Sequence, residues 1–220
     1  MSVYKRNEGR SEVVQHLNEL RLVLLKLEPE KVGDIARIVC GTYENGGRLF
    51  TCGNGGSSSI ASHLVVDLTK GLFQDSGLEI DAYCLTDNIP TITAWANDNS
   101  YDIALAAQLT PNRVQPEDCL LVFSGSGNSK NVLNAVEKAN ELKMMTVGIS
   151  GFGGGKLQDM AQYSLVVESH DMQIVEDVFS VIAHSVFKAI RASGTSSLHS
   201  HNVTSPSAMA ARIRSVTGNG

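Results

Sequence analysis

Two short stretches of the chain combine glycine with serine in a way that is typical of anion-binding turns. They are residues 53–59 (GNGGSSS) and residues 124–129 (SGSGNS). Glycine allows backbone N–H groups to approach a ligand closely, serine adds hydroxyl donors, and the N-terminus of a following helix favours negative charge. One such stretch alone is more commonly a tight turn with a helix cap. Two of them, each following an expected strand, favour a binding site for a phosphate group.

Neither stretch is a P-loop or a dinucleotide-binding loop. No Gly-Lys-Ser/Thr sequence ends either one, which excludes a P-loop, and the glycine spacing differs from the GxGxxG of a dinucleotide fold. The sequence therefore favours a phosphorylated small molecule over ATP or NAD.

Four titratable residues could carry protons or bind a metal ion. His63 and Asp67 are four residues apart in the helix expected after the first stretch, so both project from one face. Taken alone, this spacing is more typical of a surface ion pair. Glu176 and His184 are eight residues apart in the last expected helix, which is about 12 Å along its axis. Spacing alone therefore does not make them ligands of one ion.

Other polar residues have simpler interpretations. Asn97 and Asp98 could cap a helix or form a turn through their side chains. Cys52 has no basic neighbour in the sequence, so we expect a small core residue. Three histidines in a loop or in the tail are expected to be solvated: His170, His199 and His201.

The composition is that of one globular, soluble domain. Its 220 residues include 18 lysines and arginines against 23 aspartates and glutamates, for a net charge of -5. No basic excess is available to neutralise a nucleic-acid backbone, so nucleic acid is not expected as a direct partner. The cysteines form no CxxC pair, which fits reduced thiols in the cytoplasm. No apolar run approaches the roughly 18 residues of a membrane span, and none forms an export signal.

From residue 49 onward, short apolar runs alternate with helical patterns. Strands are expected at residues 49–52, 80–85, 119–123, 145–149 and 164–167. Helices are expected at residues 59–70, 91–108, 129–142 and 175–190. Such alternation predicts a parallel sheet with helices on both faces. The tail from Ser193 is polar and rich in serine, which indicates a mobile extension or an arm.

The N-terminal segment predicts two helices. From Ser11 to Leu27, leucine and valine recur at helical spacing, and further apolar residues widen the stripe around the helix. So much apolar surface needs two partners, either within its own domain or in other subunits, and we favour other subunits. The sequence EPE at residues 28–30 ends this helix, and a second helix runs to the NGG stop at residues 45–47.

Four ordered segments carry a family resemblance. They are GNGGSSSIASH, LTDNIPTITAWANDNSYD, FSGSGNSKNV and the helix from Glu176 to His184. In this order and at these separations they resemble the sugar isomerase (SIS) domain proteins, and within them the phosphoheptose isomerases. The resemblance extends from about Ser11 to Ile190, and the combination is far more specific than any single loop.

The resemblance implies a three-layer, doubly wound α/β domain with a five-stranded parallel sheet and N-terminal helices. It also implies a homotetramer assembled partly through those helices. The implied reaction is the isomerisation of sedoheptulose 7-phosphate to glycero-manno-heptose 7-phosphate through an enediolate. The expected organisation is a helical segment at residues 1–47, the SIS domain at 48–192 and a polar tail at 193–220. The alternative is a non-catalytic SIS module that binds a phosphosugar or associates with a replication initiator.

The same resemblance assigns roles to residues by their positions. The sugar would be contacted by Asn54, Gly55, Gly56, Ser57, Asn97, Asp98 and Glu176. The phosphate would be held by Ser124, Ser126 and Ser129, with Gly125 at a position where the family usually has threonine. A zinc ion would be bound by His63, Asp67, Glu176 and His184. Of these residues, Asp67 and His184 would also transfer the proton.

Besides Gly125, two of these positions depart from the family pattern. Asp67 stands where the family has a glutamate, which retracts the base by about one methylene. Glu176 stands where the family has a glutamine, which adds a negative charge to the ligand set. Two histidines and two carboxylates still suit zinc. These departures concern the identity of the substrate more than the class of reaction.

Overall fold

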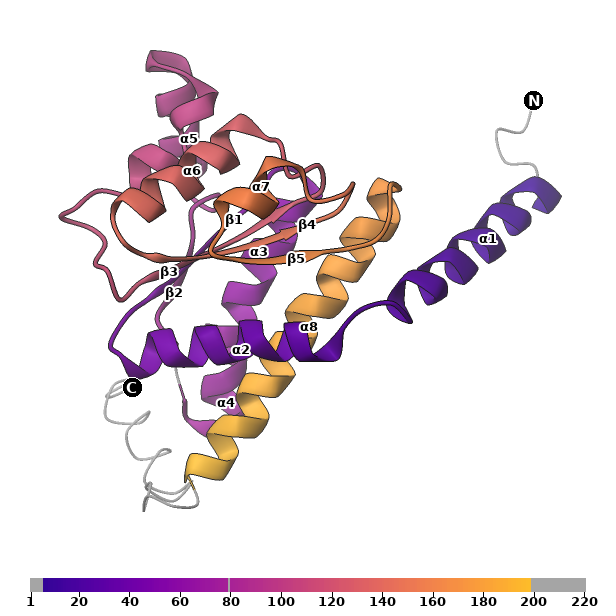
Figure 1. Ribbon diagram of the computed structural model, residues 1–220, viewed down its shortest axis with the longest axis horizontal. Helices are drawn as coiled ribbons and strands as arrows, with labels where there is room; N and C mark the ends of the chain where they lie inside the picture. The colour runs from indigo at the N-terminus through magenta and orange to yellow at the C-terminus, as the bar shows by residue number, and fades with distance from the viewer. Residues whose placement is uncertain (1–5, 79, 199–220) are drawn as a thin grey trace, which may run out of the picture.

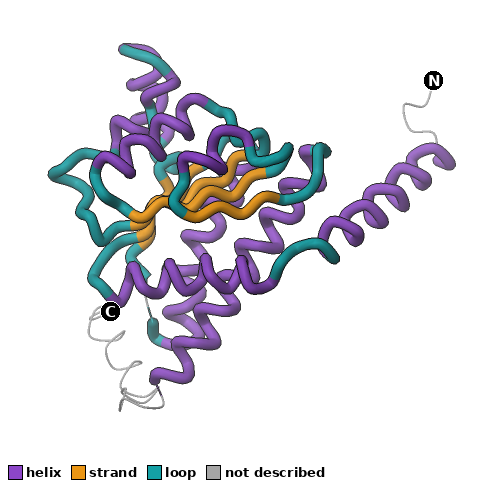
Figure 2. Tube along the Cα trace, viewed as in Figure 1, coloured by secondary structure: helices purple, strands orange, loops and turns teal. Residues whose placement is uncertain are grey.

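Five short parallel strands form one sheet in the computed structural model, which describes residues 6–78 and 80–198 (Figures 1 and 2). The strands lie in the order β2-β1-β3-β4-β5. They are β1 (Leu49–Cys52), β2 (Ala82–Cys84), β3 (Cys119–Ser124), β4 (Met145–Ser150) and β5 (Tyr163–Val166). The chain passes to one side of β1 for β2 and to the other side for β3. The carboxyl ends of β1 and β3 therefore flank the crevice where doubly wound sheets bind ligands, and the predicted fold class is confirmed.

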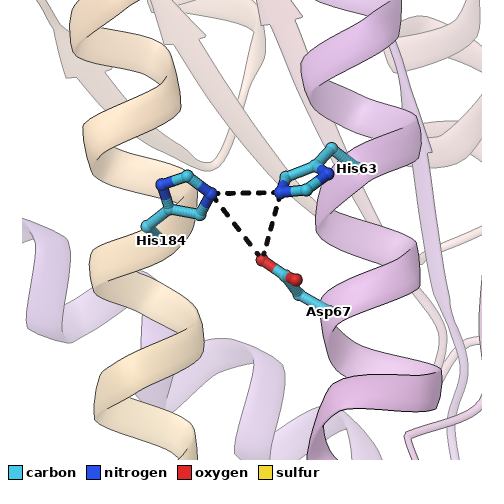
Figure 3. Close-up of side chains that lie close together, drawn as sticks. All are labelled: His63, Asp67 and His184. Carbon is cyan, nitrogen blue, oxygen red and sulfur yellow. Dashed lines mark hydrogen bonds and ion pairs between the residues drawn. The ribbon is translucent and has the colours of Figure 1, made fainter.

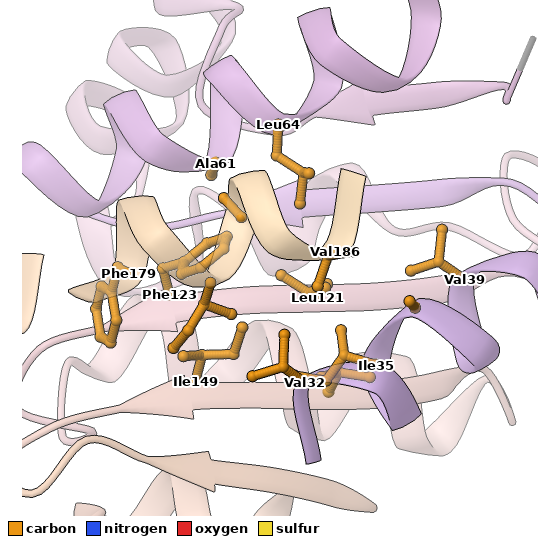
Figure 4. Close-up of a cluster of buried hydrophobic side chains, with 14 of the residues drawn as sticks. Val32, Ile35, Val39, Ala61, Leu64, Leu121, Phe123, Ile149, Phe179 and Val186 are labelled. Carbon is orange, nitrogen blue, oxygen red and sulfur yellow. The ribbon is translucent and has the colours of Figure 1, made fainter. Parts of the chain in front are cut away.

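Helices cover both faces of the sheet. One face is covered by α2 (Pro29–Glu44), α3 (Gly56–Val66) and α8 (Met172–Leu198), and the other by α6 (Lys130–Glu141) and α7 (Gly155–Met160). Alternate residues of β3 point to the two faces, with Leu121 and Phe123 on the α8 side and Leu120 and Val122 on the α6 side. In the larger core, shown in Figure 4, Phe123 lies against Phe179 of α8 with ring centroids 5.5 Å apart. Burial on both faces explains the unbroken apolar run of β3.

Helix α1 (Arg6–Leu24) extends away from the rest of the chain (Figure 1). It contacts α8, where His16 Nε2 lies 2.8 Å from Asp177 Oδ2. Val13 and Leu17 remain more than half exposed, at 57% and 59%. Leu20, Leu24 and Leu27 of the same stripe pack against the larger core. The domain itself therefore buries the C-terminal half of the stripe and leaves the N-terminal half exposed.

Two predicted helices are interrupted in the structure. The helix after the first glycine-rich stretch ends at Val66 and continues as a π-helical turn (Asp67–Gly71) and α4 (Leu72–Ser76). The helix predicted at residues 91–108 is α5 (Ile89–Asp98) followed by two 3-10 turns, Tyr101–Ile103 and Ala106–Gln108. The break has a local cause, because the Ser100 hydroxyl accepts a hydrogen bond from the Asp102 N–H and starts the first of these turns.

Helix α8 is longer than predicted at both ends. It continues to Leu198, so the first residues of the expected tail, 193–198, are helical. A single glycine in this stretch costs a helix only about 1 kcal/mol, which does not stop it. The rest of the expected tail, with His199 and His201, lies outside the described residues. Within the described ranges, no helix combines the length and apolar character needed to cross a membrane.

Candidate active site

The two glycine-rich stretches form loops at the crevice between β1 and β3. The first loop (residues 53–59) leads from β1 into α3, and the second loop (residues 124–129) leads from β3 into α6. Cys52 and Val122, at or near the ends of these strands, are paired in register, so both loops leave the same edge of the sheet. Neither α3 nor α6 is capped by the side chain of its N-cap residue. The backbone N–H groups at both helix starts therefore depend on other partners.

Helices α3 and α8 pack side by side and bring three titratable side chains together (Figure 3). His63 Nε2 lies 3.1 Å from His184 Nε2 and 3.7 Å from Asp67 Oδ2. His184 Nε2 lies 4.0 Å from the same Asp67 oxygen. The side chains of His63 and His184 are about half exposed, whereas that of Asp67 is 21% exposed. The two imidazoles of the cluster are thus accessible to solvent, whereas the carboxylate is more buried.

The sequence of α3 explains where His63 and Asp67 lie. The residue after each of them, Leu64 and Leu68, is completely buried in the core. His63 and Asp67 therefore lie at the edge of this helix, beside His184 of α8. Asp67 also begins the π-helical turn, an irregularity that is frequent at functional sites. The spacing of four residues thus places both side chains on one face, as predicted.

This cluster has the donors that a zinc ion requires. One ligand atom from each of His63, Asp67 and His184 lies within 4.8 Å of the other two. Two imidazoles and one carboxylate occur in catalytic zinc sites, where three protein ligands leave a position open for a substrate. In the part of the chain that the structure describes, no other group of three His, Cys, Asp or Glu side chains meets this spacing.

Glu176 lies elsewhere along the contact between α3 and α8. Its carboxylate rests on Gly56, so closely that a Cβ atom at that position would overlap it. Since Gly56 is the first residue of α3, the carboxylate lies at a helix N-terminus, where the dipole stabilises negative charge. The structure thus does not bring Glu176 to His63, Asp67 and His184, and its role as a fourth ligand stays a prediction.

The second loop is supported by a third glycine-rich stretch, residues 151–155, which follows β4. A Cβ atom on Gly127, whose φ is +62°, would overlap the backbone carbonyl of Gly154. The Gly127 carbonyl in turn accepts a hydrogen bond from the Leu157 N–H at 3.0 Å. The loop is therefore a cradle built by contacts between backbone segments.

The predicted phosphate ligands all belong to the second loop. Ser124 is buried, and Ser126 and Ser129 are half-buried. The Ser129 hydroxyl makes no cap bond to α6, although the residue stands at the cap position. Gly125 lies against the thioether of Met172 on α8, and a Cβ atom at Gly125 would overlap the sulfur. Met172 thus fills the space that a threonine side chain would occupy at this position.

Asn97 and Asp98 end α5, and the Asn97 amide donates a hydrogen bond to the Asp98 carboxylate at 2.8 Å. They do not cap the start of this helix, where Asn88 accepts a hydrogen bond from a backbone N–H. Three residues further on, the Tyr101 hydroxyl donates to Asn54 Oδ1 at 2.8 Å. Sequence reasoning missed Tyr101, because only the polar character of the surrounding segment marks it.

The cysteine before the first loop is a structural residue. Cys52 is completely buried. Burial raises the pKa of its thiol well above the ordinary value, and the nearby Cys84 raises this pKa further. The thiol therefore stays protonated, and the interpretation of Cys52 as a core residue is confirmed.

Comparison with known proteins gives a consistent result. A family model described as the SIS domain matches residues 14–151. The phosphoheptose isomerase of Helicobacter pylori is 35% identical over 175 residues, which are 80% of this chain and 90% of that protein. The structure of a phosphoheptose isomerase from Francisella tularensis is 28% identical, with a TM-score of 0.77 over 83% of this chain and 98% of that one. The structure of a phosphoheptose isomerase from Neisseria gonorrhoeae is 26% identical, with a TM-score of 0.71 over 84% and 96%.

Proposed function

This chain belongs to the SIS-domain family and, within it, to the phosphoheptose isomerases, and from this premise we propose that it interconverts sedoheptulose 7-phosphate and glycero-manno-heptose 7-phosphate. The observation that carries the proposal is the cluster of His63, Asp67 and His184. The first two follow the first loop, on α3 and its π-helical turn, and His184 comes from the neighbouring helix α8. An aldose–ketose isomerase needs an anion site for the phosphate and a proton carrier near the sugar carbonyl. The crevice offers groups of both kinds.

In this proposal the second loop binds the phosphate through Ser124, Ser126 and Ser129. The first loop is less suited to an anion, because the carboxylate of Glu176 already lies at the start of α3 and repels a second negative charge. The first loop therefore contacts the neutral part of the sugar. The residues that line it are Asn54, Gly55, Gly56 and Ser57, together with Asn97 and Asp98 from the end of α5.

Asp67 and His184 form the proton-transfer pair. Asp67 takes a proton from C1 of the ketose, an enediolate forms, and a proton returns at C2, with His184 as the second acid and base. Imidazole can either bind a metal or shuttle a proton, which suits this position. When zinc is bound by His63, Asp67 and His184, it supplies positive charge that stabilises a developing oxyanion.

Two substitutions at one position test the chemistry. Asp67→Asn keeps the shape of the side chain and removes the base, so we expect turnover to fall by about a thousandfold with the fold intact. Asp67→Glu restores the reach of the family's glutamate and should retain or raise turnover. The measurement is exchange of the C1 proton of sedoheptulose 7-phosphate into deuterated water, followed by NMR with zinc supplied.

Asp159→Asn, at an exposed aspartate of α7, is the matched control and should exchange like the wild type. If wild-type protein with zinc exchanges no proton of any ketose phosphate, the enzyme proposal fails. A non-catalytic SIS module that binds a phosphosugar then takes its place.

The N-terminal helices support a further proposal about assembly. We propose that residues 1–47 take part in a homotetramer, with the SIS domain at 48–192 and the polar tail at 193–220. Val13, Leu17 and Leu22 are more than half exposed on α1, and completing the burial of each in a subunit contact contributes roughly 1 to 1.5 kcal/mol. Light scattering should give about four times the 23.6 kDa of one chain, and a monomer would remove this interpretation of α1.

The state of the cysteines bears on location. The four residues Cys40, Cys52, Cys84 and Cys119 are unpaired. Unpaired thiols are usual in a reducing compartment, and we therefore propose that the enzyme acts in the cytoplasm. Cell fractionation with an antibody against the protein would test this location.

A further inference from the structure

Three polar side chains connect the first loop to two other segments at the crevice. The Oδ1 atom of Asn54 accepts hydrogen bonds from the Tyr101 hydroxyl and from Asn131 Nδ2, both at 2.8 Å. In return, Asn54 Nδ2 donates to Asn131 Oδ1 at 2.8 Å. The two amides thus hold each other in one orientation, and Asn131 comes from α6, the helix that follows the second loop.

This network determines what Asn54 can offer to a ligand. An amide oxygen has two lone pairs, and an amide nitrogen has two hydrogens. The Asn54 oxygen uses both lone pairs within the network, whereas its nitrogen uses one hydrogen and keeps the other. Asn131 is 3% exposed, so its buried amide depends on the pairing. Asn54 therefore presents a hydrogen-bond donor, which suits a hydroxyl or carbonyl oxygen of a sugar.

Tyr101 also anchors the segment that carries Asn97 and Asp98. None of the ten residues of α5 is buried, and this helix packs on the 3-10 turn that begins at Tyr101. The backbone carbonyl of Asp102, in the same turn, accepts a hydrogen bond from Asn134 of α6 at 2.9 Å. With so little buried surface, the polar contacts of this turn determine where α5 lies relative to the loops.

We propose that Tyr101 and Asn131 are positioning residues of the isomerase. They hold Asn54 as a donor toward the sugar, and Tyr101 keeps Asn97 and Asp98 at the crevice. This role rests on the function proposed above. The second loop has its own backbone contacts with residues 151–155, so its shape does not depend on the Tyr101 hydroxyl.

The test compares Tyr101→Phe with Tyr43→Phe. Tyr43, on α2, is a tyrosine of similar exposure, 40% against 49%. For Tyr101→Phe we expect KM for sedoheptulose 7-phosphate to rise about fivefold to tenfold, the size of one lost hydrogen bond, with kcat within about twofold. The dissociation constant for inorganic phosphate should not change. Tyr43→Phe should alter none of these values.

Asn131→Leu provides a second variant of the same network. Leucine has nearly the shape of asparagine and adds no charge at the start of α6, but it can neither donate to nor accept from Asn54. We expect a larger rise in KM than in Tyr101→Phe, again at unchanged affinity for inorganic phosphate. Weaker binding of phosphate together with sugar phosphate would indicate a general structural defect and would overturn the positioning role.

Failure of this inference can be told apart from failure of the proposed function. If the wild type is active and Tyr101→Phe keeps KM within twofold, the role of Tyr101 is overturned. If the wild type turns over no ketose phosphate, the proposed function fails, and calorimetry decides the role of the network. Weaker binding of sedoheptulose 7-phosphate by Tyr101→Phe than by the wild type, at unchanged phosphate affinity, would support that role. If the two proteins bind this sugar phosphate equally, or if neither binds it, the role is overturned.

Discussion

The two glycine-rich loops of the crevice have nearly the same composition, but they have different neighbours. Helix α8 places one side chain against a glycine of each loop: the carboxylate of Glu176 against Gly56, and the thioether of Met172 against Gly125. The first loop therefore already has a negative charge at the start of α3, whereas the second loop has a neutral neighbour and backbone support. Similar local sequences thus acquire different ligand preferences from one helix that packs across both.

Replacing one glycine of each loop by alanine should give the largest difference in stability between the two loops. A Cβ atom on Gly127 meets the backbone carbonyl of Gly154, and alanine would have to keep a φ of +62°. Because neither backbone segment can move aside easily, we expect Gly127→Ala to lower the free energy of unfolding by about 3 kcal/mol or more. At Gly56 the overlapping atoms belong to the flexible end of Glu176, so Gly56→Ala should cost less than about 1 kcal/mol.

Thermal unfolding followed by circular dichroism measures both variants. For a chain of this size, a loss of about 3 kcal/mol corresponds to a fall in Tm of about 6–12 °C. Equal shifts for Gly127→Ala and Gly56→Ala would show that the second loop is no more rigid than the first.

Removing hydroxyls should separate the roles of the loops in anion binding. Ser126→Ala/Ser129→Ala removes two charge-assisted hydrogen bonds to phosphate, so the dissociation constant for inorganic phosphate should rise about 100-fold. The matched variant Ser58→Ala/Ser59→Ala removes two hydroxyls from the first loop, where Ser58 already donates to the Gly55 carbonyl at 2.8 Å. Its affinity for phosphate should change by less than about threefold. The affinities are measured by calorimetry. A greater loss of phosphate affinity in the first-loop variant would show that the first loop, and not the second, binds the phosphate.

The parts of this site that sequence predicts are those fixed by residues close together in the chain. The apolar run of β3 indicates a strand buried on both faces, and the glycine-rich loops follow directly from strand ends. His63 and Asp67 share a face because they are four residues apart in one helix. Their meeting with His184 needed the family resemblance, since that residue lies on a helix far along the sequence.

The contacts that distinguish the loops could not be predicted from local pattern. Whether Glu176 reaches Gly56 or the histidine cluster depends on how α8 is placed along α3, and a shift of one helical turn is about 5.4 Å. Tyr101 was missed for a related reason, because its partner Asn54 lies 47 residues earlier and is brought near by the sheet. Such contacts are set by tertiary packing, which no local spacing encodes.

Glu176→Gln should give the smallest change among these variants. It tests the negative charge that distinguishes the first loop from the second. Glutamine keeps the length of the side chain at Gly56 and removes the negative charge at the start of α3. We expect the free energy of unfolding to fall by about 0.3 to 1 kcal/mol at low salt, as measured by urea unfolding. In about 1 M salt, where the Debye length is about 3 Å, the loss should shrink.

Glu137→Gln is the matched control for this charge, because Glu137 is an exposed glutamate in the second half of α6. Removing a negative charge there, away from the helix N-terminus, should not lower stability. If Glu176→Gln were as stable as the wild type at low salt, the start of α3 would not stabilise the carboxylate. The lower affinity of the first loop for an anion would then rest only on repulsion by the Glu176 carboxylate, and not on a favourable place for that carboxylate at the helix start.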